Sequence, residues 1–164
     1  MTFEDQMEDN DPTRERVYEW ERACVQAKVQ REVLSRNGCV DAIHEAALFL
    51  GINPPKVRFP GALSTSCYAD VTNWVMSISD WGRSRPVILH EMAHLALTQE
   101  ILAGEPMHGE GFVRMAIRLY SKLLGLDAQE LASLAVAYRI LDKSAIADFR
   151  PNASESKGFF DGEF

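Results

Sequence analysis

The chain has 164 residues, of which 46% are hydrophobic and 25% are charged, a composition typical of one globular domain. Its net charge of -7 argues against non-specific binding to nucleic acid or anionic membranes, because both need clustered cations. No stretch reaches the roughly 18 apolar residues of a membrane-spanning helix, and the acidic start MTFEDQMEDNDP is unlike a signal peptide, so a cytoplasmic location is expected.

Two helices are expected in the first third of the chain. Asp11 and Pro12 are typical of a helix start, and apolar residues then recur at helical spacing as far as Leu34. An Asn-Gly pair at positions 37 and 38 is a typical helix stop. A second helix is expected over residues 40–50, again ending at a glycine.

Three short strands are expected next, over residues 56–59, 66–69 and 74–79. The last two flank a turn at residues 70–73, which predicts a hairpin. We expect the strand at 74–79 to be the sheet edge against which an extended peptide could pair.

Three further helices are expected, over residues 84–103, 109–124 and 127–141. The order of elements predicts an α+β fold: two N-terminal helices, a small three-stranded and mostly antiparallel sheet, then three helices. Residues 11–142 are expected to form this single domain. A flexible acidic tail would precede it at residues 1–10, and an extension would follow at residues 143–164.

The segment HEMAH at residues 90–94 is the most specific chemical signal in the sequence. His90 and His94 are four residues apart, so on a helix both imidazoles leave one face and can bind one metal ion. Glu91 lies at the edge of that face, where it can act as general base toward a water whose pKa the metal lowers. This HExxH arrangement is typical of zinc-dependent hydrolases.

A catalytic zinc ion usually has three protein ligands and one open position. Metzincins carry their third histidine six residues after the second, but here that position is Glu100. The next histidine is His108, at the mouth of the following helix, where Gly109 allows close approach of the backbone. His108 is therefore the preferred third ligand, and Glu110 is the competing one.

Other polar and aromatic residues carry weaker signals. The fourth histidine, His44, has no metal-ligand partner nearby in the sequence, so no metal role is expected for it. Two tryptophans, Trp74 and Trp81, flank the strand before the HEMAH helix and are candidates for lining a cleft. A phenol that stabilises an oxyanion could come from any of three tyrosines, although packing is their commoner role: Tyr68, Tyr120 and Tyr138.

Three scattered cysteines, Cys24, Cys39 and Cys67, contain no C-x-x-C pair. Their odd number indicates free thiols in a reducing compartment, where each is expected to behave as a small buried hydrophobe.

The run VILHEMAHLAL followed by MHGEGFVRMAIRLY resembles the SprT-like zinc metallopeptidase domain. That family pairs an HExxH helix with a downstream H-G-x-x-F or H-G-x-x-W element, and the match here covers residues 87–120. The resemblance implies a zincin-like fold, with zinc on His90, His94 and His108 and with Glu91 as catalytic base. Small predicted metallohydrolases of bacteria and phages have a similar order of elements.

The expected function is hydrolysis of peptide bonds in a peptide or protein substrate, with Zn2+ as cofactor. Some SprT-like proteins act on proteins crosslinked to DNA, but this acidic chain has no basic tail and no obvious zinc ribbon, so a nucleic-acid partner is not expected. Two alternatives are a hydrolase of a non-peptide amide and a non-catalytic module whose metal only joins two helices. Glu91 argues against the second, because a structural site does not need that carboxylate. Manganese, iron or cobalt could occupy the same ligands.

Overall fold

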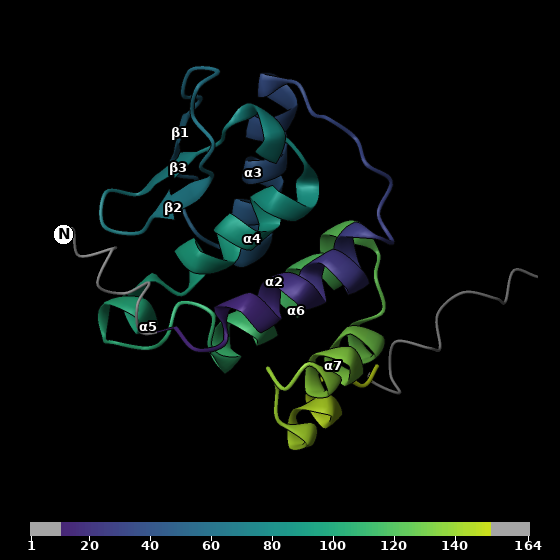
Figure 1. Cartoon of the computed structure of the whole chain (residues 1–164). Coiled ribbons are helices and arrows are strands. Elements are labelled where there is room, and N and C mark those ends of the chain that lie inside the picture. The colour runs from purple at the N-terminus through teal and green to yellow at the C-terminus, as the bar shows by residue number, and fades with distance from the viewer. Residues whose placement is uncertain (1–10, 152–164) are drawn as a thin grey trace, which may run out of the picture.

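The computed structural model describes residues 11–151, which form an α+β fold with a small three-stranded sheet (Figure 1). The expected tail at residues 1–10 and residues 152–164 of the expected extension lie outside this range. In chain order the elements are α2 (Arg14–Glu21), the π-helical turn η1 (Arg22–Gln26), α3 (Arg36–Leu50), β1 (Lys56–Arg58), β2 (Tyr68–Asp70), β3 (Val75–Ser77), the 3-10 helix η2 (Asp80–Gly82), α4 (Arg85–Ala96), α5 (Thr98–Leu102), α6 (Glu110–Leu124), α7 (Ala128–Ala137) and the 3-10 helix η3 (Lys143–Phe149).

The first helix is much shorter than the apolar spacing predicts. α2 begins at Arg14, after the expected Asp11 cap, and passes into η1, which ends at Gln26. Leu34 lies beyond it in a non-helical connection, where its backbone N–H donates to the carbonyl of Arg83 at 2.8 Å. The single helix expected as far as Leu34 was wrong, because this residue packs partly buried against the core from a connection and not from a helix face.

The Asn-Gly pair begins a helix instead of ending one. Ser35 is the N-cap of α3, and its hydroxyl accepts a hydrogen bond from the N–H of Gly38 at 3.0 Å, so Gly38 lies in the first turn. The expected stop at the other end of α3 is confirmed. Gly51 follows the helix with φ 68°, a left-handed conformation that glycine adopts without strain.

β3 is the middle strand of the sheet, with β1 parallel to it and β2 antiparallel. The expected mostly antiparallel sheet is therefore mixed, because the chain crosses to the other side of β3 between β1 and the β2–β3 hairpin. The expectation that residues 74–79 offer a free edge was also wrong. The edge next to the hairpin is β2, and β3 has a partner on each side.

The helix that carries HEMAH ends before the expected residue 103. Leu97, with φ -107° and ψ 21°, separates α4 from the short α5. The hydroxyl of Thr98 donates to the carbonyl of Leu95 at 2.8 Å, which occupies a carbonyl at the end of α4. The chain therefore changes direction within one turn of His94.

The last helices form nearly where the sequence predicts them. α6 matches its predicted range within one residue, and α7 begins at the expected cap, where the Asp127 carboxylate accepts from the N–H of Glu130 at 2.6 Å. α7 ends at Ala137, short of the expected residue 141. η3 then packs on the core through Ala145, so part of the segment expected as an extension belongs to the folded body.

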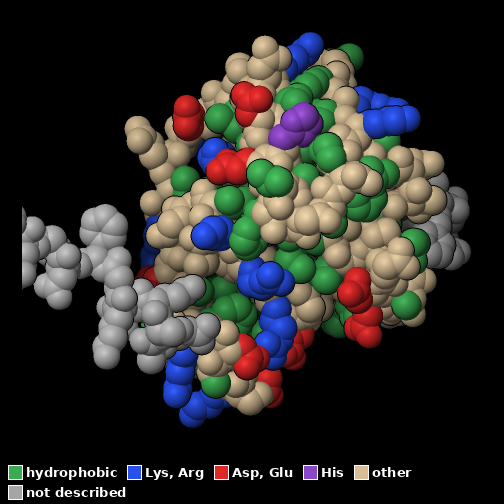
Figure 2. Space-filling view, turned by 180° about the vertical axis from the view of Figure 1, so that it is seen from behind, with side chains coloured by type: hydrophobic (Ala, Val, Ile, Leu, Met, Phe, Trp, Pro, Cys, Tyr) green, Lys and Arg blue, Asp and Glu red, His purple; other side chains and the backbone are tan. Residues whose placement is uncertain are grey.

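α4 occupies the centre of the molecule, with the sheet and α3 on one side and α2 and α6 on the other (Figure 1). Every residue from Ile88 to Leu95 is buried, so the polar side chains of this helix need partners inside the protein. The face shown in Figure 2 carries acidic and basic side chains interspersed with apolar ones. None of the helices within residues 11–151 has the length and apolar character that crossing a membrane requires.

Candidate metal centre

The three histidines that the sequence singles out lie together in the interior. His90 and His94 project from one face of α4, and their Nε2 atoms are 3.2 Å apart. His108 lies just before α6, and its Nε2 is 3.3 Å from Nε2 of His90. One nitrogen from each ring lies within 4.8 Å of the others, and all three residues are buried.

This spacing suits a metal ion. Two nitrogens bound to one zinc ion at about 2.0–2.1 Å in tetrahedral geometry are roughly 3.3 Å apart. The observed Nε2 separations of 3.2 and 3.3 Å agree with that value. Imidazole nitrogen is also a ligand that zinc and other transition metals favour. The three histidines can therefore hold a metal ion.

The competing third ligand, Glu110, lies elsewhere. It is the first residue of α6, and its carboxylate accepts from the guanidinium of Arg114 at 2.8 and 2.9 Å, partly exposed to solvent. Among the described residues the group that could hold a metal contains His90, His94 and His108 but not Glu110. His44 is exposed on α3, away from this group.

Two buried carboxylates contact the outer nitrogens of two of these histidines, and neither was predicted to belong to the site. Both oxygens of Glu21 accept from Nδ1 of His90, at 2.8 and 3.0 Å. Oδ2 of Asp11 lies 2.6 Å from Nδ1 of His108 and also accepts from its backbone N–H at 3.1 Å. Asp11, expected as a helix cap, therefore holds a ligand instead.

These carboxylates determine which way the imidazole protons point. When Nδ1 of His90 and of His108 each donates to a carboxylate and the ring is neutral, its Nε2 atom presents a lone pair. The two lone pairs face one another across 3.3 Å, a repulsive arrangement unless a cation or a proton lies between them. Nδ1 of His94 is buried and has no hydrogen-bond partner among the described residues.

The electrostatics of the site favour one positive charge among the rings. Burial lowers the pKa of His90, but the charge and hydrogen bonds of Glu21, with the charge of Glu91, raise it overall to about 9. Burial and the two neighbouring imidazoles lower the pKa of His94 well below its usual value. Burial also lowers the pKa of His108, against the hydrogen bond and charge of Asp11.

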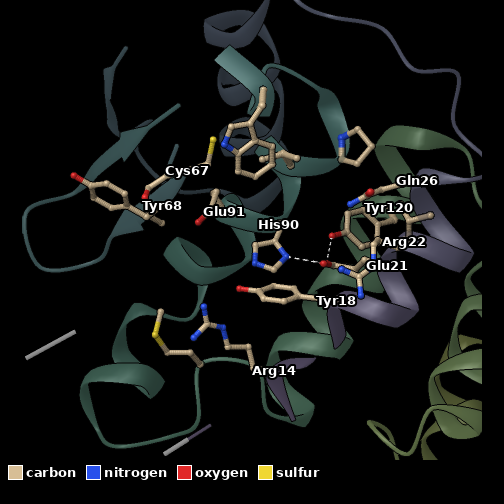
Figure 3. Close-up of a pocket in the computed structure, with 17 residues that line it drawn as sticks. Arg14, Tyr18, Glu21, Arg22, Gln26, Cys67, Tyr68, His90, Glu91 and Tyr120 are labelled. Atoms are coloured by element: carbon tan, nitrogen blue, oxygen red, sulfur yellow. Dashed lines mark hydrogen bonds and ion pairs between the residues drawn. The ribbon is translucent and has the colours of Figure 1, made fainter. Parts of the chain in front are cut away.

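Glu91 lies at the wall of a cavity of about 610 Å3 that opens beside the triad. Its carboxyl group is buried and accepts a hydrogen bond from the backbone of Ala69 in β2. Burial raises the pKa of Glu91, whereas the charge of His90 and the hydrogen bond from Ala69 lower it. The net result is a pKa of about 7. His90 also lines the cavity, so the candidate metal site borders it through this histidine (Figure 3).

A tyrosine outside the three sequence candidates packs on the triad. The ring of Tyr18, on α2, lies 5.1 Å from that of His108 and 5.7 Å from that of His90. It lines the cavity, and its hydroxyl shares a hydrogen bond with Arg14. Burial raises the pKa of this phenol, although Arg14 lowers it, so it keeps its proton at neutral pH.

The other aromatic candidates have different roles. The Tyr120 hydroxyl donates to Oε1 of Glu21 at 2.5 Å, so it is engaged inside the protein. Tyr68 lines the cavity, and Figure 3 shows its ring turned away from His90, whereas Tyr138 follows α7 and does not line it. Trp81 lines the cavity as expected, but Trp74 does not.

All three cysteines are free thiols, as predicted. Cys24 and Cys39 are buried, and Cys67 is half-buried at the cavity wall, where its Sγ lies 3.2 Å from the Ser79 hydroxyl.

No protein-family model, curated protein or solved structure matches the chain. The function is therefore inferred from the geometry of the site, and the SprT-like resemblance stays a prediction.

Proposed function

We propose that this protein is a zinc-dependent metallopeptidase that uses Glu91 as its general base. The observation that carries the proposal is the convergence of three imidazoles, spaced for one metal ion, beside a cavity that His90 and Glu91 line. Three histidine ligands leave the fourth position of a tetrahedral ion open, as in catalytic rather than structural zinc sites.

In the proposed reaction a bound metal ion supplies a Lewis acid and lowers the pKa of water. Glu91 takes a proton from the attacking water, whose oxygen forms a bond to the carbonyl carbon of the substrate. Glu91 then passes that proton to the amide nitrogen as the carbon–nitrogen bond breaks. Its position beside His90 and its access to the cavity suit this shuttle.

The hydroxyl of Tyr18 is the proposed donor to the oxyanion that develops on the carbonyl oxygen. Its ring rests on two of the metal-binding histidines, and it lines the same cavity as Glu91. A neutral phenol held beside the reacting group stabilises the charge through a hydrogen bond, without transfer of its proton.

The position of β2 favours a peptide as the substrate over a non-peptide amide. β2 is an edge strand, and two of its residues, Tyr68 and Ala69, line the cavity. An extended peptide could pair with the edge of such a strand next to Glu91, whose carboxyl group already accepts the hydrogen bond from Ala69. The same cavity counts against a purely structural role, because a structural metal needs no access for a substrate.

The SprT-like assignment is part of this proposal. It is supported by the motif match and by the order of elements, in which α4 carries the HExxH residues and His108 lies at the start of α6. The net charge of -7 supports a protein or peptide substrate without a nucleic-acid partner. A cytoplasmic location belongs to the same proposal.

Substitution of Glu91 by Gln tests the mechanism. We expect Glu91→Gln to retain one zinc ion per chain by metal analysis and to cleave an unfolded protein substrate at least about 100-fold more slowly than the wild type. Glu100→Gln, which changes an exposed carboxylate on α5, serves as the matched control and should keep full activity. Undiminished cleavage by the zinc-loaded Glu91→Gln protein would exclude Glu91 as the general base.

A further inference from the structure

The N-terminal segment that contains α2 reaches the candidate metal centre at two separate points. At its start, Asp11 binds the side chain and backbone of His108, and the Thr13 hydroxyl donates to the carbonyl of His108 at 2.7 Å. At its end, Glu21 binds the ring of His90. Asp11 and Glu21 therefore bracket α2, and each contacts a different ligand.

Both carboxylates are almost completely shielded from solvent. The side chain of Glu21 is 6% exposed and that of Asp11 is 2% exposed. A buried carboxylate is strongly unfavourable unless opposite charge and hydrogen bonds compensate it. The hydroxyl of Tyr120 adds one hydrogen bond to Glu21 at 2.5 Å (Figure 3). Each carboxylate also contacts the ring of one histidine of the triad, so a positive charge on the triad acts on both.

A divalent cation on three neutral imidazoles would supply that compensation. The charge of a divalent cation equals the combined charge of Asp11 and Glu21. The rings of His108 and His90 would lie between the cation and these two carboxylates. Carboxylates in this position also hold the imidazole rings in orientation and make them stronger ligands. The favourable interaction works in both directions, so the carboxylates strengthen metal binding and the metal strengthens docking of the segment.

α2 would not be stable as an isolated helix, so its conformation depends on contacts with the rest of the protein. It is only eight residues long, below the length at which an isolated helix is stable in water, and it is followed by a π-helical turn. Its buried residues, Val17 and Trp20, attach it to the core. Asp11 and Glu21 attach the segment further, through His108 and His90, which lie 97 and 69 residues away in the sequence.

We propose that residues 11–21 are an integral part of the metal site, with Asp11 and Glu21 as its positioning residues, so that metal binding and docking of α2 form one linked equilibrium. The inference rests on the metal centre of the proposed function and extends it. It assigns to the N-terminal segment a role that neither the HExxH motif nor the downstream H-G-x-x-F element contains.

The first measurement is hydrogen exchange of the wild-type protein, with and without zinc. We expect zinc to slow exchange of the backbone amides in residues 14–26 at least about 10-fold, because release of the segment then requires loss of the metal interaction. Equal exchange with and without bound zinc would overturn the inference. This measurement needs no variant and therefore decides the question even if a substitution prevents folding.

The second measurement compares metal binding in three variants. Asp11→Asn and Glu21→Gln should each weaken zinc binding by about 10- to 100-fold and shift the visible absorption bands of the cobalt-substituted protein, because ring orientation and ligand strength change. Glu19→Gln, an exposed carboxylate on the same helix, should change neither. Unaltered affinity and cobalt spectra in folded Asp11→Asn and Glu21→Gln would overturn the positioning role. A wild-type protein that binds no zinc would instead overturn the proposed function.

Discussion

At the scale of single residues, the sequence places one carboxylate on the buried side of a helix, next to the candidate metal centre. Glu21 occurs among Val17, Trp20 and Cys24 at the spacing of one helical face, and it is buried. A charged residue at such a position indicates a buried partner. The sequence does not indicate which partner, and only the fold identifies His90 and Tyr120.

Tyr18 provides a prediction at the same scale. Removal of its hydroxyl in Tyr18→Phe should lower kcat by about 100- to 1,000-fold with little change in KM, because a donor to the transition state is lost while the ring still packs on His90 and His108.

Tyr68→Phe is the matched control for that substitution. Tyr68 also lines the cavity, but its ring is turned away from His90, so its hydroxyl should not affect kcat (Figure 3). Steady-state kinetics on a peptide substrate measure both variants. An equal loss of kcat in the two would contradict the role of Tyr18.

At the scale of elements, the β2–β3 hairpin depends on one carboxylate. Burial alone would raise the pKa of Asp70, but hydrogen bonds from the side chain and N–H of Asn73 and from the N–H of Thr72 lower it overall. The folded state therefore favours the ionised carboxyl more than the unfolded state does. Its contribution to stability is present above the unfolded pKa near 3.8 and is lost as the pH falls through the lower folded value.

Asp70→Ala tests this contribution. We expect the variant to lose about 1 kcal/mol of unfolding free energy at pH 6 to 7, since it removes the acceptor of these hydrogen bonds. The difference between variant and wild type should narrow as the pH is lowered below about 4. Urea unfolding at several pH values measures it, and a difference that stays constant or grows on acidification would contradict the assignment.

The contact between η2 and the segment before β2 depends on a glycine. A Cβ added at Gly82 would overlap Sγ of Cys67, whereas one at Gly61 would meet no atom within 4 Å. We expect Gly82→Ala to lower the free energy of unfolding by about 1–3 kcal/mol, and Gly61→Ala to change it by less than about 0.5 kcal/mol. In a Cys67→Ala background most of the Gly82→Ala penalty should disappear, as a double-mutant cycle measures.

At the scale of the whole molecule, the candidate metal centre joins parts of the chain that are far apart in sequence. α4 and α6 supply or flank the ligands, and the segment with α2 supplies the carboxylates behind them. A metal ion that binds only the folded state stabilises it by about 2.7 kcal/mol when its free concentration is 100 times the Kd. For a domain of this size that corresponds to a rise in Tm of roughly 5–10 °C.

Thermal unfolding with zinc and with a chelator measures this linkage. We expect the rise in Tm to vanish in His94→Ala, because a ligand is lost, and to persist in His44→Ala, because His44 is exposed and outside the triad. A Tm that zinc raises equally in wild type and His94→Ala would show that the stabilising ion binds elsewhere.

The sequence by itself determined the features that depend on one or two turns of backbone. The spacing of His90 and His94 places both on one helix face, and the helix stop at Gly51 follows from the conformational freedom of glycine. The extent of α6 follows in the same way from local periodicity. The α+β class follows from the order of such elements.

Tertiary structure alone decided how distant segments meet. Three features depend on packing between separate elements. They are the side of β3 on which β1 pairs, the break in the first predicted helix, and the approach of His108 to His90. The same holds for Asp11 and Glu21, whose partners lie 97 and 69 residues away. Local periodicity indicates which face of an element is buried, but it does not indicate which other element packs against that face. The donors of the candidate metal site were therefore predictable from the sequence, whereas the carboxylates that support them became visible only in the fold.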